Sequence, residues 1–295
     1  MDKSHLNTYH IGFVLGPCLN ASGRLDTAKR ALSMLQAKDK KEADLMAGDL
    51  KALNDSRKEL TLEAVEQAAE QVETTDILND RVLVIYLPDC HESLAGIVAG
   101  RIREKYYRPV FVLTDAESGI KGSGRSIEGY HMYEELSKCK RLLTKFGGHA
   151  LAAGVSLEKE NVEEFRRMLN MQCTLTEKEM REKIMIDMEM PFHCVTEQFV
   201  SELELLEPFG KGNTKPVFAA RNVEVLNTRI LGKNRNVLKL QVRDQNHTVV
   251  DAMYFGDIQE MMQRIQQKPI MITYYPKLND YMGKITPQIV ITHYQ

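Results

Sequence analysis

Long apolar runs are absent from this chain of 295 residues. Because a membrane-spanning helix needs roughly 18–20 predominantly apolar residues in a row, we expect no membrane contact. The first residues, MDKSHLNTYHIGFVLG, also lack the basic region, long apolar core and small-residue cleavage site of a signal peptide. Together these absences predict a cytoplasmic protein.

Paired cysteines are missing as well. The five cysteines are scattered, odd in number and never spaced as CxxC: Cys18, Cys90, Cys139, Cys173 and Cys194. This pattern argues against both a disulfide framework and a zinc knuckle. We therefore expect free thiols.

The sequence contains none of the common motifs that hold catalytic metals. Hydrolysis of a phosphodiester usually requires aspartates and histidines that converge on one or two divalent ions, yet DxD, DHH, HxH and HEXXH do not occur. The segment from Asp89 to Glu92 is the one dense group of acids and histidine, and it is too small for a two-metal site. We predict no metal ligands here and keep His91 and Glu92 as residues that could line a site.

The charge that is present is unevenly distributed. A net charge of −2 combines an acidic segment, residues 39–80, with a basic one, residues 208–243. The basic segment holds eight lysines and arginines against a single acid, Glu224. Such a segment is typical of a surface that binds a polyanion, although a solvated strand face is the other interpretation.

The apolar pattern predicts two domains, in keeping with a length above the usual 100–200 residues of one domain. Helical spacing indicates a short helix over residues 26–36 and a helix of roughly 50 Å from Asp39 to about Val72. A helix of this length usually bridges two domains, and packing within one domain is the alternative. Strand, helix and strand then alternate from residue 81 to residue 115, which predicts a parallel unit with a site at the carboxyl ends of its strands.

After EPFGKGNTKPVF the signals are those of β-structure. Five strands with one intervening helix suit a small closed barrel of the OB type, and a β-sandwich remains possible. The predicted fold class is therefore α/β plus all-β. This domain also has aromatic residues among its basic residues: Tyr254, Phe255, Tyr274, Tyr275 and Tyr281. They could stack on unpaired nucleic-acid bases, although the alternation of the strands assigns at least half of them to the core.

GSGRS, residues 122–126, has the composition of a phosphate-binding loop. Its glycines, Gly124 among them, would free backbone amides to turn toward one point. Arg125 would offer a bidentate fork, and Ser123 and Ser126 would offer hydroxyls. A turn with a surface arginine would have the same composition.

Two further glycine-rich segments have similar chemistry. In GGHALAAG, the small residues Gly147 and Gly148 would let a ligand approach His149, which could hydrogen-bond a phosphate or protonate a leaving group. A structural histidine near a helix start is the alternative. In GPCLNASGRL, a loop before a helix, Asn20 and Arg24 are the polar candidates, and Arg24 could instead cap the helix.

These three segments, their order and the β domain behind them resemble RecJ, the single-stranded-DNA-specific 5′→3′ exonuclease family of the DHH phosphoesterase superfamily. GPCLNASGRL is similar to the family's GPRLNAAGRL motif, with Cys18 where arginine is common, and HESLAG stands where HPGVIG is frequent. KGSGRSIEGYHMYEEL, LLTKFGGHALAAGVSL and EPFGKGNTKPVF resemble later family motifs. The related oligoribonucleases and cyclic-dinucleotide phosphodiesterases share the glycine–histidine segment but lack the OB domain.

The resemblance implies a division of the chain. Residues 1–38 would be the end of the DHH catalytic domain, 39–80 the connecting helix, 81–183 the DHH-associated domain and 184–295 the OB domain. The Mn²⁺ or Mg²⁺ of the family would be held by a DHH domain that this sequence does not contain. An exposed interface for that domain could also cause self-association.

The resemblance also implies site roles and a partner, single-stranded DNA. His149 would act at the reacting phosphate. The residues that would contact phosphates or DNA are Asn20, Arg24, Ser123, Gly124, Arg125, Ser126, Gly147 and Gly148. The chain would be either the substrate-binding part of an exonuclease that needs its absent half, or a single-strand-binding module without catalysis. A phosphodiesterase for short oligonucleotides is a further alternative.

Overall fold

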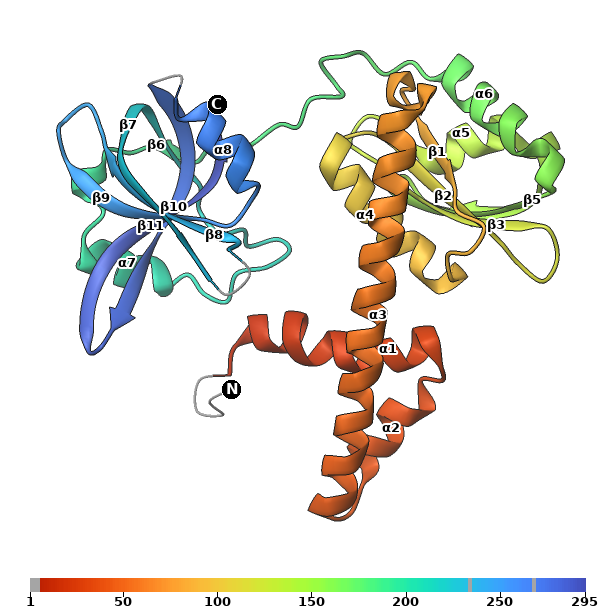
Figure 1. Cartoon of the computed structure of the whole chain (residues 1–295), viewed down its shortest axis with the longest axis horizontal. Coiled ribbons are helices and arrows are strands. Elements are labelled where there is room, and N and C mark those ends of the chain that lie inside the picture. The colour runs from red at the N-terminus through yellow and green to blue at the C-terminus, as the bar shows by residue number, and fades with distance from the viewer. Residues whose placement is uncertain (1–5, 233–234, 267–268) are drawn as a thin grey trace. The chain divides into compact units, whose positions relative to one another are not determined.

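The structure is a computed structural model that describes residues 6–232, 235–266 and 269–295. The chain divides into two compact units, Met1–Glu182 and Lys183–Gln295 (Figure 1). Within the described residues, no helix is both long enough and apolar enough to cross a membrane.

The first unit begins with helices. A π-helical turn, η2 (His10–Leu15), continues directly into α1 (Gly16–Leu25), and α2 (Lys29–Gln36) and α3 (Lys40–Thr74) follow. The predicted long helix is confirmed: the Asp39 carboxylate caps α3 by accepting a hydrogen bond from the Glu42 amide at 2.9 Å. At 1.5 Å per residue its 35 residues span about 52 Å. α3 packs on α1, α2 and α4 and on β1, all within one unit.

A five-stranded sheet follows, in the order β1-β2-β3-β5-β4. The strands and the turns and helices between them are η3 (Asp76–Asn79), β1 (Leu83–Tyr86), α4 (Glu92–Tyr106), β2 (Val110–Asp115), β3 (Ile120–Arg125), α5 (Met132–Lys138), η4 (Lys140–Leu142), β4 (Leu143–Gly148), β5 (Ala152–Leu157), η5 (Lys159–Asn161) and α6 (Val162–Gln172). β1 and β2 are parallel and connected through α4, as predicted, whereas the other pairings are antiparallel.

The sheet has a core on each face. One core joins α3 and α4 to Leu83, Ile85, Val110 and Val112. The other lies against α5 and α6 and contains Phe111, Leu113 and residues of β5. This division fixes which side chains of β3 point toward α4.

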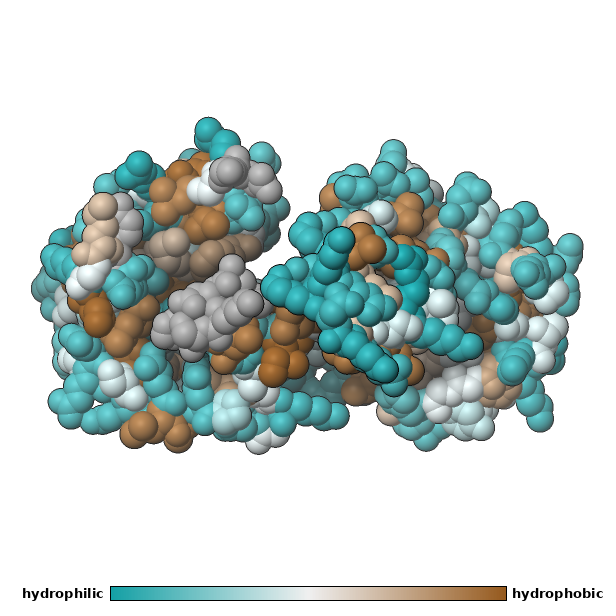
Figure 2. All heavy atoms as spheres, turned by 90° about the horizontal axis from the view of Figure 1, so that it is seen from below, coloured by the Kyte–Doolittle hydropathy of each residue, from teal (hydrophilic) through white to brown (hydrophobic). Residues whose placement is uncertain are grey.

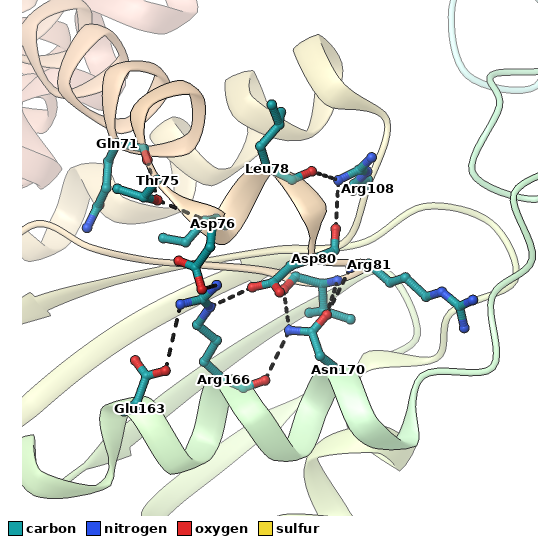
Figure 3. Close-up of polar contacts among 12 residues, drawn as sticks. Gln71, Thr75, Asp76, Leu78, Asp80, Arg81, Arg108, Glu163, Arg166 and Asn170 are labelled. Atoms are coloured by element: carbon teal, nitrogen blue, oxygen red, sulfur yellow. Dashed lines mark hydrogen bonds and ion pairs between the residues drawn. The ribbon is translucent and has the colours of Figure 1, made fainter.

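Polar contacts fasten α6 to the start of β1 (Figure 3). The Arg166 guanidinium donates to Asp80 at 2.5 Å and lies 3.1 Å from the Asp76 carboxylate. The Asn170 amide accepts from the Arg81 and Val82 backbone N–H groups and donates to the Val82 carbonyl. Asn170 therefore supplies the hydrogen bonds that a neighbouring strand would otherwise supply at this point of the sheet edge.

Two of the three segments predicted as glycine-rich loops are regular structure. GPCLNASGRL forms α1, which follows directly after the π-helical turn of η2 and has Pro17 in its first turn. GSGR lies in β3 because Gly122 and Gly124 are required for packing: a Cβ on Gly124 would lie 2.6 Å from Phe111 Cε1. The third segment is the β4–β5 hairpin, so His149 is followed by a strand and does not lie near a helix start.

The second unit is the predicted closed barrel. Its elements are β6 (Met188–Glu189), η6 (Phe192–Cys194), α7 (Glu197–Glu204), β7 (Phe218–Leu231), β8 (Val237–Arg243), β9 (Val249–Tyr254), α8 (Ile258–Arg264), β10 (Ile270–Tyr281) and β11 (Lys284–Tyr294). Pairing runs β7-β8-β9-β11-β10 and closes from β10 back to β7, with β9 and β11 parallel. Five strands with a helix after the third form an OB-type barrel and rule out the sandwich.

Candidate phosphate-binding site

Ser123 and Arg125 lie on the same face of β3. Successive residues of a strand point to opposite faces, and Gly122 and Gly124, which alternate with Ser123 and Arg125, face the core that contains Phe111 and Leu113. The two polar side chains therefore face α4. Gly96 of α4 makes this approach possible, because a Cβ there would lie 2.8 Å from Arg125 Nη2 and 3.4 Å from Ser123 Oγ.

Arg125 belongs to a group of four arginines that includes two not predicted from the sequence. Desolvation lowers the pKa of Arg125, and the positive charges of Arg24 and Arg103 lower it further. The pKa of Arg57 on α3 is also lowered, first by desolvation and then by Arg24. Like charges gathered in this way favour an anion between or beside them.

The polar partners of these arginines within the described residues are mostly neutral. Arg24 donates to the Ser93 carbonyl at 2.8 Å, Arg125 to the Gly124 carbonyl at 2.8 Å, and Arg57 to Asn54 Oδ1 at 2.9 Å. Among the described residues, only Arg103 of these four has a carboxylate neighbour, Glu104, at 3.5 Å. The described part of the chain therefore leaves most of this positive charge uncompensated.

His149 lies at the turn of the β4–β5 hairpin and is exposed. Its backbone N–H donates to the Ala152 carbonyl at 2.9 Å, and the Leu151 N–H lies 3.2 Å from Nδ1. When Nδ1 accepts this bond, the proton of the neutral ring resides on Nε2. Nε2–H is then the group that a ligand oxygen would meet.

A groove of about 460 Å³ opens beside Ser123. Its lining comes from α4, from β2 and from the strands β3, β5 and β4: Glu92, Thr114, Lys121, Gly122, Ser123, Lys145, Phe146, Gly147, Gly154, Val155 and Ser156. Glu92 lines this groove, and its role in a functional site stays a prediction. His91 is absent from the lining and instead caps α4, where its ring accepts from the Ser93 amide at 3.3 Å.

The remaining predicted residues differ in accessibility. Asn20 is exposed and shares a face of α1 with Arg24, four residues on. The Ser126 side chain is buried, and its hydroxyl donates to the Tyr130 carbonyl at 2.7 Å. Ser126 therefore supports the turn after β3 and does not face the groove in this conformation.

The barrel has a second polar groove, of about 280 Å³, on the outer surface of β7, β8 and β9. Arg229, Lys239, Asn227 and Gln241 are among its lining residues. Lys239 pairs with Asp251 at 2.7 Å, so only part of the basic segment is uncompensated there. Lys233 lies outside the described residues.

The aromatic residues of the barrel are divided as alternation predicts. Tyr254 and Tyr274 are buried in the core, and Phe255 is 60% exposed. Tyr275 lies beneath the Lys215 ammonium, which is 4.4 Å from the ring centroid. The side chain of Tyr281 lies outside the described residues.

Within the described residues, no group of three or more histidine, cysteine, aspartate or glutamate side chains is placed to hold a metal ion. The arginines and lysines around the grooves are themselves cationic and therefore repel a divalent metal ion. These residues therefore do not fit a divalent metal site, and the chemistry described below concerns phosphate contacts only.

Comparison with known proteins agrees with the two units. The DHHA1 domain family model matches residues 79–174, and the RecJ OB domain model matches residues 186–293. The single-stranded-DNA-specific exonucleases RecJ of Bacillus subtilis and Escherichia coli are 32% and 30% identical to the chain over 98% of its length. The chain spans 37% and 52% of the length of these two relatives.

Solved structures show the same likeness. RecJ from Thermus thermophilus in complex with Mn²⁺ superposes with a TM-score of 0.78 at 25% identity, over 97% of this chain and 41% of that one. The complex with Mg²⁺ gives a TM-score of 0.77. With its DHH-associated and OB domains in the RecJ order, the chain belongs to the RecJ family and corresponds to the carboxyl-terminal part of those proteins.

Proposed function

We propose that this chain is the DNA-binding part of a RecJ-type exonuclease that degrades single-stranded DNA from its 5′ end. The observation that carries the proposal is the arginine group around Arg125, which is assembled with almost no carboxylate partner among the described residues. Guanidinium groups bind phosphate oxygens through two parallel hydrogen bonds. A phosphate of the strand is the ligand that fits this charge.

Each residue of the site has a distinct task in this proposal. Arg125 and Arg24 bind the phosphate, and the Ser123 hydroxyl donates to one of its oxygens. His149 donates from Nε2 to the phosphate or to the leaving oxygen. Family relatives solved with Mn²⁺ or Mg²⁺ suggest that a divalent ion supplies the nucleophile and charge neutralisation. Its ligands would come from residues other than those described here.

The barrel would hold the strand farther from its end. Its polar groove on β7, β8 and β9 would receive the strand, because OB folds bind oligonucleotides on the face of their second and third strands. Exposed aromatic and cationic side chains give sequence-tolerant affinity, because every base has a face to stack and every nucleotide has a charge. This division of labour suits an enzyme that accepts single strands of any sequence.

The proposal is tested by fluorescence anisotropy with a 5′-phosphorylated single-stranded oligonucleotide in the presence of Mn²⁺. Arg125→Gln should weaken binding about tenfold and reduce the slope of log K against log salt by about one phosphate contact. Arg101→Gln is the matched control, since Arg101 lies on α4 with 66% of its side chain exposed. Equal affinity of the Arg125→Gln and Arg101→Gln variants would refute the assigned role of Arg125.

An apolar surface on the amino-terminal helices predicts self-association of the chain when it is studied alone. Tyr9, Ile11 and Phe13 are 60%, 63% and 73% exposed, and Figure 2 shows apolar side chains among hydrophilic ones on one face of the molecule. Exposed apolar patches are usually covered by another protein surface. Light scattering should give a mass above that of one chain, and Phe13→Ser should lower it; a monomer at all concentrations would contradict this expectation.

A further inference from the structure

The groove beside Ser123 is built from two parallel rows of residues that cross β3, β5 and β4. Ser123 pairs with Gly154, and Gly154 pairs with Gly147. Two residues along each strand, Lys121 pairs with Ser156, and Ser156 with Lys145. Residues directly opposite each other in antiparallel strands point to the same face, so both rows lie on the face that carries Arg125.

The glycine row has no explanation in the packing of the described chain. A Cβ on Gly147 would meet no atom within 4 Å, and a Cβ on Gly154 would meet only the Gly122 carbonyl oxygen at 3.9 Å. Neither glycine has a positive φ. Glycine weakens a strand that could carry another residue, and within strands it often marks the close approach of a ligand or backbone.

The neighbouring row carries positive charge and a hydroxyl. Lys145 is exposed and makes no ion pair within the described residues. Lys121 lies 2.9 Å from the Glu92 carboxylate, on the wall of the groove formed by α4. Lys145 is therefore the row's free cation among the described side chains, with Ser156 between the two lysines as a hydrogen-bond donor.

We propose that the row of Lys121, Ser156 and Lys145 is a second phosphate subsite. It binds the internucleotide phosphate adjacent to the phosphate held at Ser123 and Arg125. The two rows lie about 7 Å apart, because residues i and i+2 of a strand are separated by twice its rise per residue. Successive phosphates of an extended single strand have a similar separation. The glycine row lets the sugar between the two phosphates approach the sheet. This subsite rests on the proposed function, since its place is defined relative to the phosphate that Ser123 and Arg125 would bind.

A solvated sheet face is the alternative explanation of the lysines. Antiparallel sheets often expose one polar face to water. That explanation accounts for Lys121, Lys145 and Ser156, but it gives no reason for two opposed glycines where β-branched or charged residues would stabilise the strands. The subsite accounts for both rows.

The experiment compares two probes that differ by one nucleotide, and therefore by one internucleotide phosphate: thymidine 5′-monophosphate and the 5′-phosphorylated thymidine dinucleotide. Binding to the full chain is followed by NMR titration of the backbone amides of β3, β4 and β5. Lys145→Gln should weaken binding of the dinucleotide several-fold, reduce its salt slope by about one contact, and leave the mononucleotide unaffected. Lys140→Gln, a charge change in the turn before β4, is the control and should affect neither probe.

A second variant tests the role of the glycine row in binding without changing the charge of the chain. Gly154→Ala should leave the melting temperature unchanged or higher, yet weaken binding of the dinucleotide more than that of the mononucleotide. If Lys145→Gln and Gly154→Ala both bind the dinucleotide as the parent chain does while Arg125→Gln weakens both probes, the subsite is wrong and the proposed function stands. If neither probe binds the parent chain, both proposals fail.

Discussion

Replacing Arg166 by methionine is expected to lower the free energy of unfolding of the first unit by about 3 kcal/mol. The Arg166 side chain is only 14% exposed and its partner Asp80 only 18%. Burial by itself lowers the pKa of Arg166, but its hydrogen bonds to Asp80 and Asp76 outweigh burial and raise it. Methionine retains the apolar contacts of the side chain and leaves the Asp80 carboxylate without its cation in a poorly solvated place.

Arg167→Met is the matched control for this prediction. Arg167 is the next residue of the same helix, and its pair with Glu164 is solvent-exposed, so its loss should change the free energy of unfolding far less than the loss of Arg166. Urea-dependent hydrogen exchange of peptides from β1 and α6 measures the first unit separately from the barrel. Similar values for the two variants would show that the contacts in Figure 3 contribute little to stability.

Gly148→Ala is expected to destabilise the β4–β5 hairpin by about 2–4 kcal/mol, because it combines an unfavourable φ with a backbone clash. Gly148 has φ 152°, and a Cβ there would lie 2.4 Å from the Ala152 carbonyl oxygen and 2.6 Å from Ala153 Cα. Neither atom belongs to a flexible side chain that could move away. Hairpin distortion would also displace His149, the next residue.

Gly147→Ala provides the comparison, since the neighbouring glycine has open space around its Cβ position. Alanine there should leave stability unchanged or raise it by about 0.5–1 kcal/mol, as expected for glycine replaced within a strand. Hydrogen exchange of β4 and β5 measures both variants. A Gly148→Ala chain as stable as the Gly147→Ala chain would contradict the assigned conformation of the turn.

The elements that the sequence predicted well are those whose signal is repeated along many residues. The long helix has an Asp39 cap and apolar residues at helical spacing, and the barrel strands alternate between core and surface. Each position adds independent support, so the start of α3 and the strand count of the barrel could be inferred.

The glycine-rich segments could not be assigned in the same way. A glycine needed for a turn and a glycine needed because a neighbour fills its Cβ position are identical in sequence. Gly124 is of the second kind, with Phe111 and Met132 occupying that space, whereas Gly148 is of both kinds, since its φ is positive and Ala152 and Ala153 fill its Cβ position. Only the three-dimensional neighbours distinguish them, which is why β3 was predicted as a loop.

The site itself was predicted in part for a related reason. Ser123, Arg125 and His149 belong to short motifs whose composition is unusual. Arg57 lies in an ordinary stretch of α3, and Lys145 precedes the glycines of its motif without being marked as a ligand. Both become part of the charged surface only through the packing of α3 beside α1 and the register of β4 with β5. Long-range register leaves no trace in a local pattern.

The crowding of positive charge around Arg125 also has a thermodynamic consequence. Folding brings Arg24 and Arg103 near Arg125, and Arg57 near Arg24, against the repulsion of like charges, so these contacts cost free energy that an unfolded chain avoids. A bound polyanion removes that cost, and by linkage it must then stabilise the folded chain as it binds. Under the proposed function, the phosphates of a bound single strand would supply the negative charge that these arginines lack among the described residues.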